Sequence, residues 1–380
     1  MWPHRSGPAG TGHTVPVPGL TWMTPALGEL VSCESPSADA VATRGCIDVL
    51  SALTAEHLDA RPELIEVAGH THARFAWGQP RVLLIGHLDT VWPMGTLARW
   101  PFAVDGDVAT GPGAFDMKAG VVQAIAALTT LDDLEGVCLL LTTDEEVGSP
   151  TSRELILDTA RGCRAALVCE PAAGAAVKTA RKGIAMYDLI ATGRAAHAGL
   201  EPEKGANASV ALAHAVVAAA ALGAPALGTT VTPTTLHGGT TTNTVPASAQ
   251  CSLDVRAADP SELPRVEAGL REALAAAEAA VPGVSMSLAG GINRPPLDAT
   301  SSAELFSRAS RLAVSLGMPA LQGVAVGGGS DGNFTAGAGV ATLDGLGAVG
   351  GGAHAEGEHV LLSQMEPRAR LLAALVSDLR

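Results

Sequence analysis

Histidine and acidic side chains follow several apolar runs of this 380-residue chain, at the positions where those runs end. In VLLIGHLDTV (82–91), His87 and Asp89 come directly after a run of apolar residues and a glycine. Two imidazoles together with several carboxylates are the ligands that zinc and similar divalent cations prefer. The complete set of candidates is His87, Asp89, Asp116, Asp144, Glu145, Glu146, Glu170 and His354.

These side chains can meet only if the runs that precede them become neighbouring strands. RVLLIGHLD, GVCLLLTTDEE and RAALVCEP have the composition of buried strands, and KAGVVQAIAALTTL and SRELILDTAR between them favour helices. Continuously apolar strands that alternate with helices are typical of an α/β fold with a mostly parallel sheet and helices on both faces. In such a sheet, binding sites form at the edge shared by the carboxyl ends of the strands. The predicted fold therefore brings the candidates together.

Each motif taken alone is a weak indication. An HLD sequence after a strand is more often a loop with a turn aspartate, DEE is more often a solvated turn, and GGGAH is typical of a flexible loop. Their common position at one edge of one sheet favours metal binding over these ordinary interpretations.

The number of candidate ligands favours two metal ions over one. A single catalytic zinc takes three protein ligands and a water, whereas this edge offers five plausible ligands and a spare carboxylate. Asp116 is suited to bridge two ions that lie about 3.5–4 Å apart. If Glu145 and Glu146 stand on an extended segment, they point to opposite sides. One of the two is then a ligand, and the other faces the attacking water as a general base.

The sequence pattern changes near residue 183. From GIAMYDLIATGRAAH to VSMSLAGG the order is strand–helix–strand–strand–helix–strand, which is typical of the ferredoxin-like α+β sandwich. We therefore predict an inserted dimerisation or lid domain over 183–293, within a metal-binding domain formed by 19–182 and 294–380. Residues 1–18, rich in Gly and Pro, are expected to be disordered. Ser261 is predicted to cap the helix that begins at Glu262.

The overall composition disfavours several classes of partner. The net charge is −14, whereas nucleic acids and anionic membranes require a basic face. No apolar run reaches the length of about 18 residues that a membrane span needs, and the N-terminus lacks the apolar stretch of a signal peptide. The six cysteines form no CxxC pair. We expect a reduced, soluble, cytoplasmic protein without nucleic-acid or membrane partners.

Six stretches carry a family resemblance and occur in the family's order. They are GHLDTVWPMGTLARWPFAVDGDVATGPGAFDMKAG, TTDEEVGSPTSRELI, CEPA, GRAAHAG, NTVPASAQCSLDVR and GGGSDGNF. With these residues the chain resembles the zinc-dependent aminoacylase/carboxypeptidase family, which includes acetylornithine deacetylase and succinyl-diaminopimelate desuccinylase. Within that family it is most similar to the bacterial glutamate carboxypeptidases that cleave folates.

The resemblance implies two zinc ions per subunit, with cobalt or manganese as possible replacements. His87, Asp116 and Glu170 correspond to the ligands of one ion. Asp116, Glu146 and His354 correspond to the ligands of the other, so that Asp116 bridges the pair. The resemblance also implies a zinc-peptidase-like fold for the metal-binding domain.

The same resemblance assigns the acid–base roles. Glu145 corresponds to the general base, and Asp89 corresponds to the residue that orients His87 and fixes its tautomer. Relatives often have a cis peptide bond after the bridging aspartate, which is here the Asp116–Met117 bond. Met117 itself departs from the residues usual at that position, and the stretch GGGAHAEGE around His354 departs from the family's aromatic-containing motif.

A histidine of the inserted domain is implied to act across a dimer. His197, in GRAAHAG, corresponds to a residue that reaches the active site of the partner subunit and helps to stabilise the oxyanion. The resemblance thus implies a homodimer formed through the inserted domain. Ala196 stands where relatives usually have serine. This departure leaves the metal ligands intact but does not determine the identity of the substrate.

Several other positions are candidates for substrate binding. Asn243 and Arg256 match positions that bind substrate in relatives. The fork geometry of arginine, in Arg256 or Arg294, suits a terminal carboxylate, and the backbone N–H groups of the glycine loop suit the same group. Lys178, after the CEP turn, suits the side-chain carboxylate of a glutamate. The candidates are Lys178, Asn243, Arg256, Arg294, Gly328 and Gly329. Arg256 is equally compatible with a structural role in a strand.

Together these features predict a di-zinc metallohydrolase that cleaves an amide bond and releases a C-terminal amino acid, with glutamate expected, from N-acyl, peptidyl or folate-like substrates. The same scaffold also suits an N-acyl amino acid deacylase or a dipeptidase. A non-catalytic binding protein on a degenerate hydrolase scaffold is a further alternative. A nucleotide-binding protein that uses VAVGGGSDGNF is disfavoured, since no strand–GxGxxG–helix unit accompanies that loop.

Overall fold

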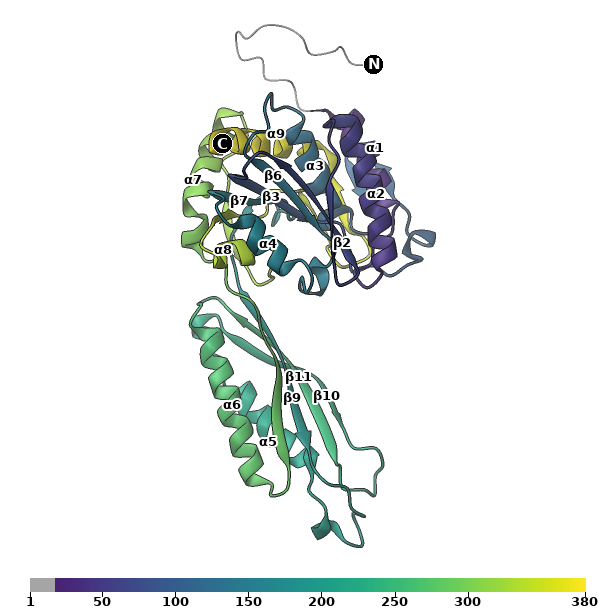
Figure 1. Ribbon diagram of the computed structural model, residues 1–380, viewed down its shortest axis with the longest axis vertical. Coiled ribbons are helices and arrows are strands. Elements are labelled where there is room, and N and C mark those ends of the chain that lie inside the picture. The colour runs from purple at the N-terminus through teal and green to yellow at the C-terminus, as the bar shows by residue number, and fades with distance from the viewer. Residues whose placement is uncertain (1–17) are drawn as a thin grey trace.

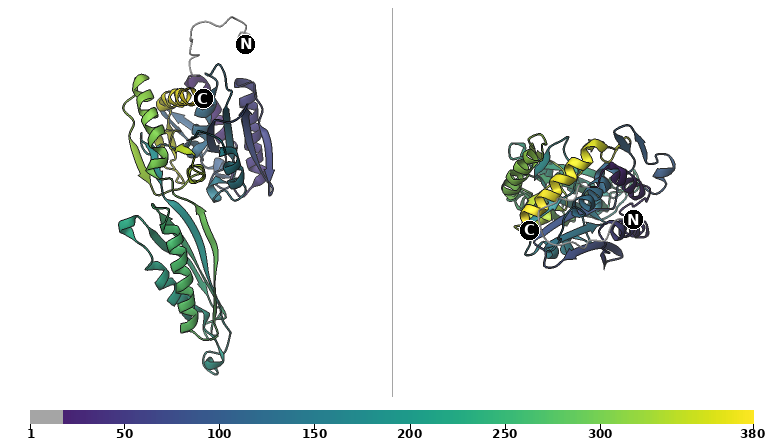
Figure 2. Two further views of the ribbon diagram at one scale, coloured as in Figure 1. Left: turned by 60° about the vertical axis from the view of Figure 1, so that its left-hand side comes forward. Right: turned by 90° about the horizontal axis from the view of Figure 1, so that it is seen from above.

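The computed structural model describes residues 18–380 and divides them into two lobes joined end to end (Figure 1). The predicted disorder of residues 1–18 falls almost wholly outside the described residues. The first lobe contains the elements before β9 and after β12, and the second lobe contains β9 to β12. Figure 2 shows that the second lobe is narrow and extends away from the first.

A six-stranded sheet forms the centre of the first lobe, in the order β1-β2-β6-β3-β7-β14. The strands β6, β3, β7 and β14 are parallel, and β1 and β2 add an antiparallel edge. This arrangement confirms the predicted mostly parallel sheet. The strands are β1 (Glu63–Val67), β2 (His70–Trp77), β3 (Val82–His87), β6 (Val137–Thr142), β7 (Ala165–Val168) and β14 (Ala341–Leu343).

Helices cover both faces of this sheet, as predicted. Val82 and Leu84 of β3 belong to a core on one face, whereas Leu83 and Ile85 belong to a separate core on the other face, because successive strand residues point to opposite sides. The first face is covered by α1 (Leu20–Val31), α2 (Ala40–His57), α3 (Ala119–Leu128), α7 (Ala299–Ser315) and α9 (Leu362–Leu379). The second face is covered by α4 (Arg153–Ala160) and α8 (Gly332–Gly337).

The second lobe is an antiparallel four-stranded sheet in the order β10-β11-β9-β12. Two helices pack on one of its faces over a core of their own, and the predicted order of strands and helices is confirmed. The elements are β9 (Gly183–Thr192), α5 (Ala208–Ala220), β10 (Thr230–Gly238), β11 (Ser248–Ala257), α6 (Glu262–Ala280) and β12 (Ser285–Arg294).

The predicted cap of α6 is wrong. The Ser261 side chain makes no capping bond and its backbone is already helical. Instead, the carboxylate of Asp259 accepts hydrogen bonds from the backbone N and the hydroxyl of Ser261, at 2.8 and 2.6 Å. An aspartate two residues earlier therefore closes the first turn, because its carboxylate can reach the N–H groups that a helix start leaves unpaired.

Two small sheets complete the first lobe. One pairs β8 (Val177–Arg181) with β13 (Gly323–Val326). The other has the order β15-β16-β5-β4, with β15 (Gly350–Gly351), β16 (His359–Leu361), β5 (Val108–Thr110) and β4 (Ala103–Asp105). The second sheet matters for the site, since it brings the segment around residue 354 beside the loop that follows β5. Within residues 18–380, no helix combines the length and the apolar character that crossing a membrane requires.

Candidate active site

The predicted metal ligands meet at the carboxyl end of the central sheet. His87 is the last residue of β3, and Glu170 follows β7. Nε2 of His87 lies 3.4 Å from Oδ1 of Asp116 and 3.6 Å from Oε1 of Glu170. Nε2 of His354 lies 3.5 Å from Oδ2 of Asp116 and 3.1 Å from Oε2 of Glu146. The Asp116 carboxylate thus lies between the two imidazoles, one oxygen toward each.

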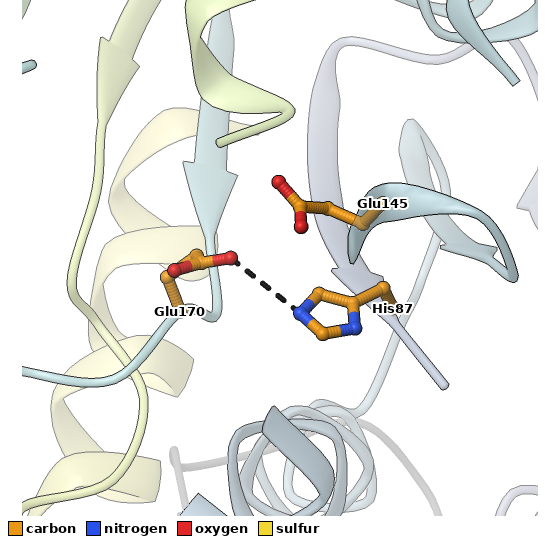
Figure 3. Close-up of side chains that lie close together, drawn as sticks. All are labelled: His87, Glu145 and Glu170. Atoms are coloured by element: carbon orange, nitrogen blue, oxygen red, sulfur yellow. Dashed lines mark ion pairs between the residues drawn. The ribbon is translucent and has the colours of Figure 1, made fainter. Parts of the chain in front are cut away.

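The donor set fits a divalent cation. Ligand atoms of His87, Asp116 and Glu146 lie within 4.8 Å of one another, and so do those of His87, Glu145 and Glu170, which Figure 3 shows pointing toward a common point. Two of the buried atoms, Nε2 of His87 and Oε1 of Glu146, have no hydrogen-bond partner. Buried polar atoms without a partner are costly, and a bound ion would satisfy both. Nitrogen and carboxylate oxygen donors suit zinc.

Asp89 holds more of the site than the orientation of one imidazole. Nδ1 of His87 lies 3.0 Å from the backbone oxygen of Asp89 and 3.5 Å from its carboxylate. The fully buried carboxylate also accepts hydrogen bonds from the backbone N of Glu145 and of Glu146, at 3.3 and 3.1 Å, and from the Ser37 hydroxyl at 2.7 Å. One side chain therefore fixes both the β3 end and the segment after β6.

Glu145 and Glu146 diverge, but not for the predicted reason. They do not stand on an extended segment, since Glu145–Val147 forms a 3₁₀ helix, η3. In such a helix successive side chains are about 120° apart, because three residues complete a turn. The Glu146 carboxylate consequently meets His354, while the Glu145 carboxylate meets Arg294.

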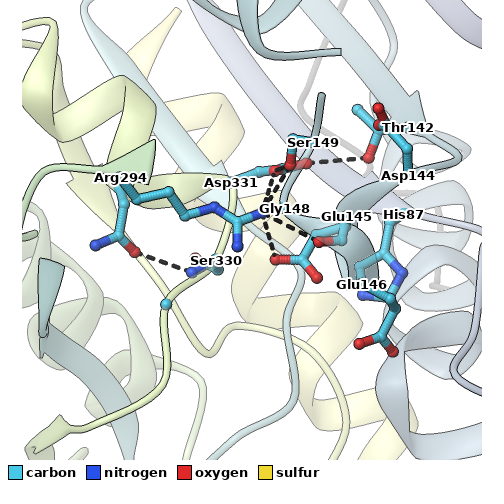
Figure 4. Close-up of polar contacts among 12 residues, drawn as sticks. His87, Thr142, Asp144, Glu145, Glu146, Gly148, Ser149, Arg294, Ser330 and Asp331 are labelled. Carbon is cyan, nitrogen blue, oxygen red and sulfur yellow. Dashed lines mark hydrogen bonds and ion pairs between the residues drawn. The ribbon is translucent and has the colours of Figure 1, made fainter. Parts of the chain in front are cut away.

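Arg294 lies directly against the predicted general base (Figure 4). Its Nη2 is 3.0 Å from Oε1 of Glu145, 2.6 Å from the Ser149 hydroxyl and 3.2 Å from Oδ1 of Asp331. The guanidinium also lies 5.2 Å from the centre of the Phe334 ring. This arginine, predicted to bind substrate, is buried and already engaged by side chains of the first lobe.

The electrostatics favour a cation at the cluster. Burial strongly raises the pKa of Glu145, although Arg294 opposes the shift. Burial lowers the pKa of His87, but Asp116 and the other carboxylates outweigh it and hold that pKa well above its usual value. Hydrogen bonds to Asp116 and Glu146 raise the pKa of His354 to about 10. Without a metal, protons on the histidines balance the carboxylates, and a bound ion would replace them.

Arg181 holds the predicted ligand Glu170, and the sequence did not predict this contact. Burial opposes ionisation of Glu170, but Arg181, His87 and Lys178 together outweigh it and lower the pKa of Glu170 to about 2. Nη2 of Arg181 lies 2.9 Å from the Glu170 carboxylate, and Nζ of Lys178 lies 3.6 Å from it. Arg181 also pairs with Asp344 at 2.8 Å. Lys178 therefore lies beside the cluster.

Arg181 also binds the glycine loop predicted to bind substrate. Its Nη1 donates to the carbonyl oxygens of Gly328 and Gly329, at 3.2 and 3.0 Å. Because the carbonyl groups are taken by Arg181, the orientation of this loop is coupled to the same guanidinium that holds Glu170.

The remaining candidates lie in the second lobe. The backbone N of Ala198, next to His197, donates to the Asn243 carbonyl at 2.9 Å, so these two candidates lie together. They follow the ends of β9 and β10 that are remote from the first lobe, and ten strand residues span roughly 30 Å. Within one chain, His197 and Asn243 are therefore not brought to the metal cluster. Arg256, on β11, pairs with Asp254 at 2.7 Å.

Glu358 is another residue that sequence reasoning missed. Its fully buried carboxylate accepts hydrogen bonds from the backbone N of Asp116 and of Phe115, at 2.9 and 2.8 Å. Its spacing of four residues from His354 was the available signal, but Glu356 shares the same polar stretch. The Asp116–Met117 peptide bond is cis, as the resemblance implied.

Comparisons with known proteins agree with this geometry. Residues 83–378 match the peptidase family M20/M25/M40. The chain is 32% identical to carboxypeptidase G2 of Pseudomonas sp. (strain RS-16) over 311 residues, which cover 80% of this chain and 74% of that protein. It is 29% identical to succinyl-diaminopimelate desuccinylase of Ehrlichia chaffeensis over 143 residues, covering 33% of this chain and 37% of the other.

Solved structures share the fold at lower sequence identity. Aminopeptidase PepT of Bacillus cereus superposes with a TM-score of 0.75 at 21% identity, covering 95% of this chain and 99% of that one. The M20 family metallo-carboxypeptidase of Sulfolobus solfataricus has a TM-score of 0.75 at 16% identity, covering 93% and 98%. By sequence match, fold and ligand geometry, the chain belongs to peptidase family M20/M25/M40 and is a metal-dependent hydrolase.

Proposed function

We propose that this protein is a di-zinc hydrolase that cleaves an amide bond and releases a C-terminal amino acid, with glutamate the expected residue. The observation that carries the proposal is the Asp116 carboxylate, which directs one oxygen to His87 and the other to His354, at 3.4 and 3.5 Å. An aspartate so placed is suited to bridge two ions, and each histidine has a further carboxylate of its own.

The residues divide into two ligand sets around that aspartate. His87, Asp116 and Glu170 would hold one ion, and Asp116, Glu146 and His354 would hold the other. Glu145 also lies within ligand distance of His87. We assign it to proton transfer because its carboxylate is held by Arg294 at 3.0 Å. When bound, the ions supply Lewis acidity and lower the pKa of water toward neutrality.

The chain's own groups provide the proton transfers. The Glu145 carboxylate accepts a proton from the water that attacks the carbonyl carbon, and then delivers it to the leaving amine nitrogen. Burial raises the pKa of Glu145, which favours the protonated carboxyl that holds the proton between the two transfers. Asp89 keeps His87 and the backbone of Glu145 in place during both steps.

A second subunit is the proposed source of the oxyanion donor. His197 lies at the end of the second lobe remote from the cluster of its own chain. We therefore assign the donor to the partner subunit's His197 in a homodimer formed through the second lobe. The expected location of such a protein is the cytoplasm.

The proposed substrate is an N-acyl, peptidyl or folate-like derivative of glutamate. Lys178, beside Glu170 at 3.6 Å, is the candidate partner of a side-chain carboxylate. Arg256 is the more accessible candidate for the terminal carboxylate, since Arg294 is buried and engaged by Glu145. Asn243 is proposed to approach the substrate across the dimer.

The neighbouring loop is a further candidate for the terminal carboxylate. The backbone N–H groups of Gly328 and Gly329 are proposed to donate to it. Relatives named as desuccinylases favour a second candidate function, removal of an acyl group from an amino acid.

A substrate panel tests the proposal. Zinc-loaded protein is incubated with N-acyl and aminobenzoyl amino acids in which only the released residue varies. We expect the highest kcat/KM for glutamate, followed by aspartate. A preference for diaminopimelate or another basic residue would favour the deacylase. Zinc-loaded protein that binds these compounds but hydrolyses none would identify a binding protein.

A further inference from the structure

Glu358 is a buried carboxylate that accepts four hydrogen bonds, three of them from the 113–116 loop that carries Asp116. Its Oε1 accepts from the backbone N of Phe115 and Asp116, at 2.8 and 2.9 Å. Its Oε2 accepts from Nε1 of Trp92 and the backbone N of Gly113, at 2.9 and 3.1 Å. The carboxylate thus binds three of the four backbone N–H groups of the 113–116 loop, and one of these bonds comes from the proposed bridging ligand Asp116 itself.

The same residue closes the turn that carries His354. The backbone N of Glu358 donates to the Ala355 carbonyl, and that of Ala355 donates to the Gly352 carbonyl, at 3.1 and 3.0 Å. A side chain on Gly352, which has φ +79°, would come within 3.0 Å of the Glu358 backbone. His354 itself has φ +62°, a conformation that is unfavourable outside glycine and persists only where neighbouring contacts enforce it.

The burial of Glu358 has a free-energy cost that its N–H donors must offset. Burial raises its pKa, while its N–H donors oppose that shift. Across residues 18–380, no lysine or arginine forms an ion pair with it, so N–H groups alone satisfy the carboxylate. Hydrogen bonds to ionised acceptors are stronger than neutral ones, and here they connect two segments that lie 242 residues apart.

We propose that Glu358 is a positioning residue that holds Asp116 and His354 at a fixed separation and so sets the affinity of the ion that these two residues share with Glu146. The inference rests on the proposed two-ion function. The position of His354 depends on Glu358 more than that of His87 does, because the His354 side chain is 52% exposed and its turn is closed by Glu358. His87, at the end of a buried strand, does not depend on it.

The test is zinc binding by Glu358→Gln. The amide keeps one acceptor oxygen but turns an NH₂ group toward two N–H donors. Loss of a partner of this kind typically weakens metal binding about 10- to 100-fold. We expect one of the two zinc ions to be weakened by such a factor while the other is retained, measured by competition with a chelator. The absorption spectrum of the cobalt-substituted variant should change for one site.

A kinetic readout separates positioning from general stability. With excess zinc, the kcat of Glu358→Gln should recover toward the wild-type value, because the ligand atoms remain. Glu356→Gln is the matched control, since Glu356 lies two residues away, is exposed and, among the described residues, forms an ion pair with Arg99 alone. The control should bind two ions with wild-type affinity.

Each outcome decides a separate question. If the wild type binds fewer than two ions, the proposed function fails whatever the variant does. If the wild type binds two ions and Glu358→Gln binds both with unchanged affinity, the role of Glu358 is refuted, even if the variant melts earlier. Should Glu358→Gln not fold, Trp92→Phe removes a single donor and decides instead. A several-fold loss for one ion supports the role, and unchanged binding of both overturns it.

Discussion

The two lobes differ in where their polar side chains lie and in how far those side chains are buried. In the first lobe β3, β6 and β7 are buried along their whole length, so polar groups gather where these strands end, and they are themselves nearly buried. In the second lobe one sheet face is open, and exposed and buried residues alternate along β9 and β11. His197 and Asn243 there are both exposed. The first lobe thus preorganises the proposed reaction centre, whereas the candidate groups of the second lobe would have to be brought to it.

The strongest test of this contrast removes Glu145, the proposed proton carrier of the first lobe. Glu145→Gln keeps the shape of the side chain and its bond to Arg294 but cannot accept a proton. We expect kcat to fall about 100- to 10,000-fold, with two zinc ions retained. Steady-state kinetics and metal analysis check this, with the exposed Glu154→Gln as control. Retained turnover would remove Glu145 from the mechanism.

The next test asks whether the second lobe acts across a dimer. His197→Ala should lower kcat about 100- to 1,000-fold, the usual effect of losing one oxyanion donor, without changing zinc content. Mixing it with Glu145→Gln should restore activity to about a quarter of the wild type, since half the random dimers have one intact site. No recovery on mixing, with dimers shown to exchange subunits, would contradict the assignment across subunits.

The smallest expected effect concerns the zinc-free cluster. The pKa of His354 is raised from 6.5 to about 10 by its bonds to Asp116 and Glu146. A group with a higher pKa in the folded state stabilises the fold below its unfolded value, and this contribution is lost as pH rises through the folded value. Zinc-free protein should therefore lose stability between pH 6.5 and about 10, with Tm falling by on the order of a few degrees.

His354→Gln provides the comparison for that titration, because glutamine cannot be protonated. Thermal unfolding of chelator-treated protein should give a flatter pH profile for the variant than for the wild type. Parallel profiles would show that His354 is not held by these carboxylates in solution.

The clustering of the proposed metal ligands could be predicted from sequence because each one follows a continuously apolar strand or a glycine-rich loop. Parallel strands place such positions at one edge whatever the details of packing. The second lobe was predictable for a similar reason, since the period-two alternation of its strands and the order of its elements are local features.

Contacts between distant segments were not predictable in this way. Arg181 and Glu358 gain their roles from partners that only the tertiary structure brings near, and no local pattern separates Glu358 from Glu356. The extended conformation expected for Glu145 and Glu146 was wrong because Asp89 binds both backbone N–H groups and η3 forms. Ser261 does not cap α6 as expected, because the carboxylate of Asp259, two residues earlier, accepts a hydrogen bond from its backbone N.

The two connections between the lobes both carry an arginine from the junction into the cluster. Arg181 precedes β9, its backbone pairs with Leu297 on the returning connection, and its side chain holds Glu170. Arg294 ends β12 and its side chain holds Glu145. Any rotation of the second lobe about this junction would therefore act on Glu170, the proposed zinc ligand, and on Glu145, the proposed proton carrier, at once. Movement of the second lobe would in this way be coupled to the geometry of the proposed active site.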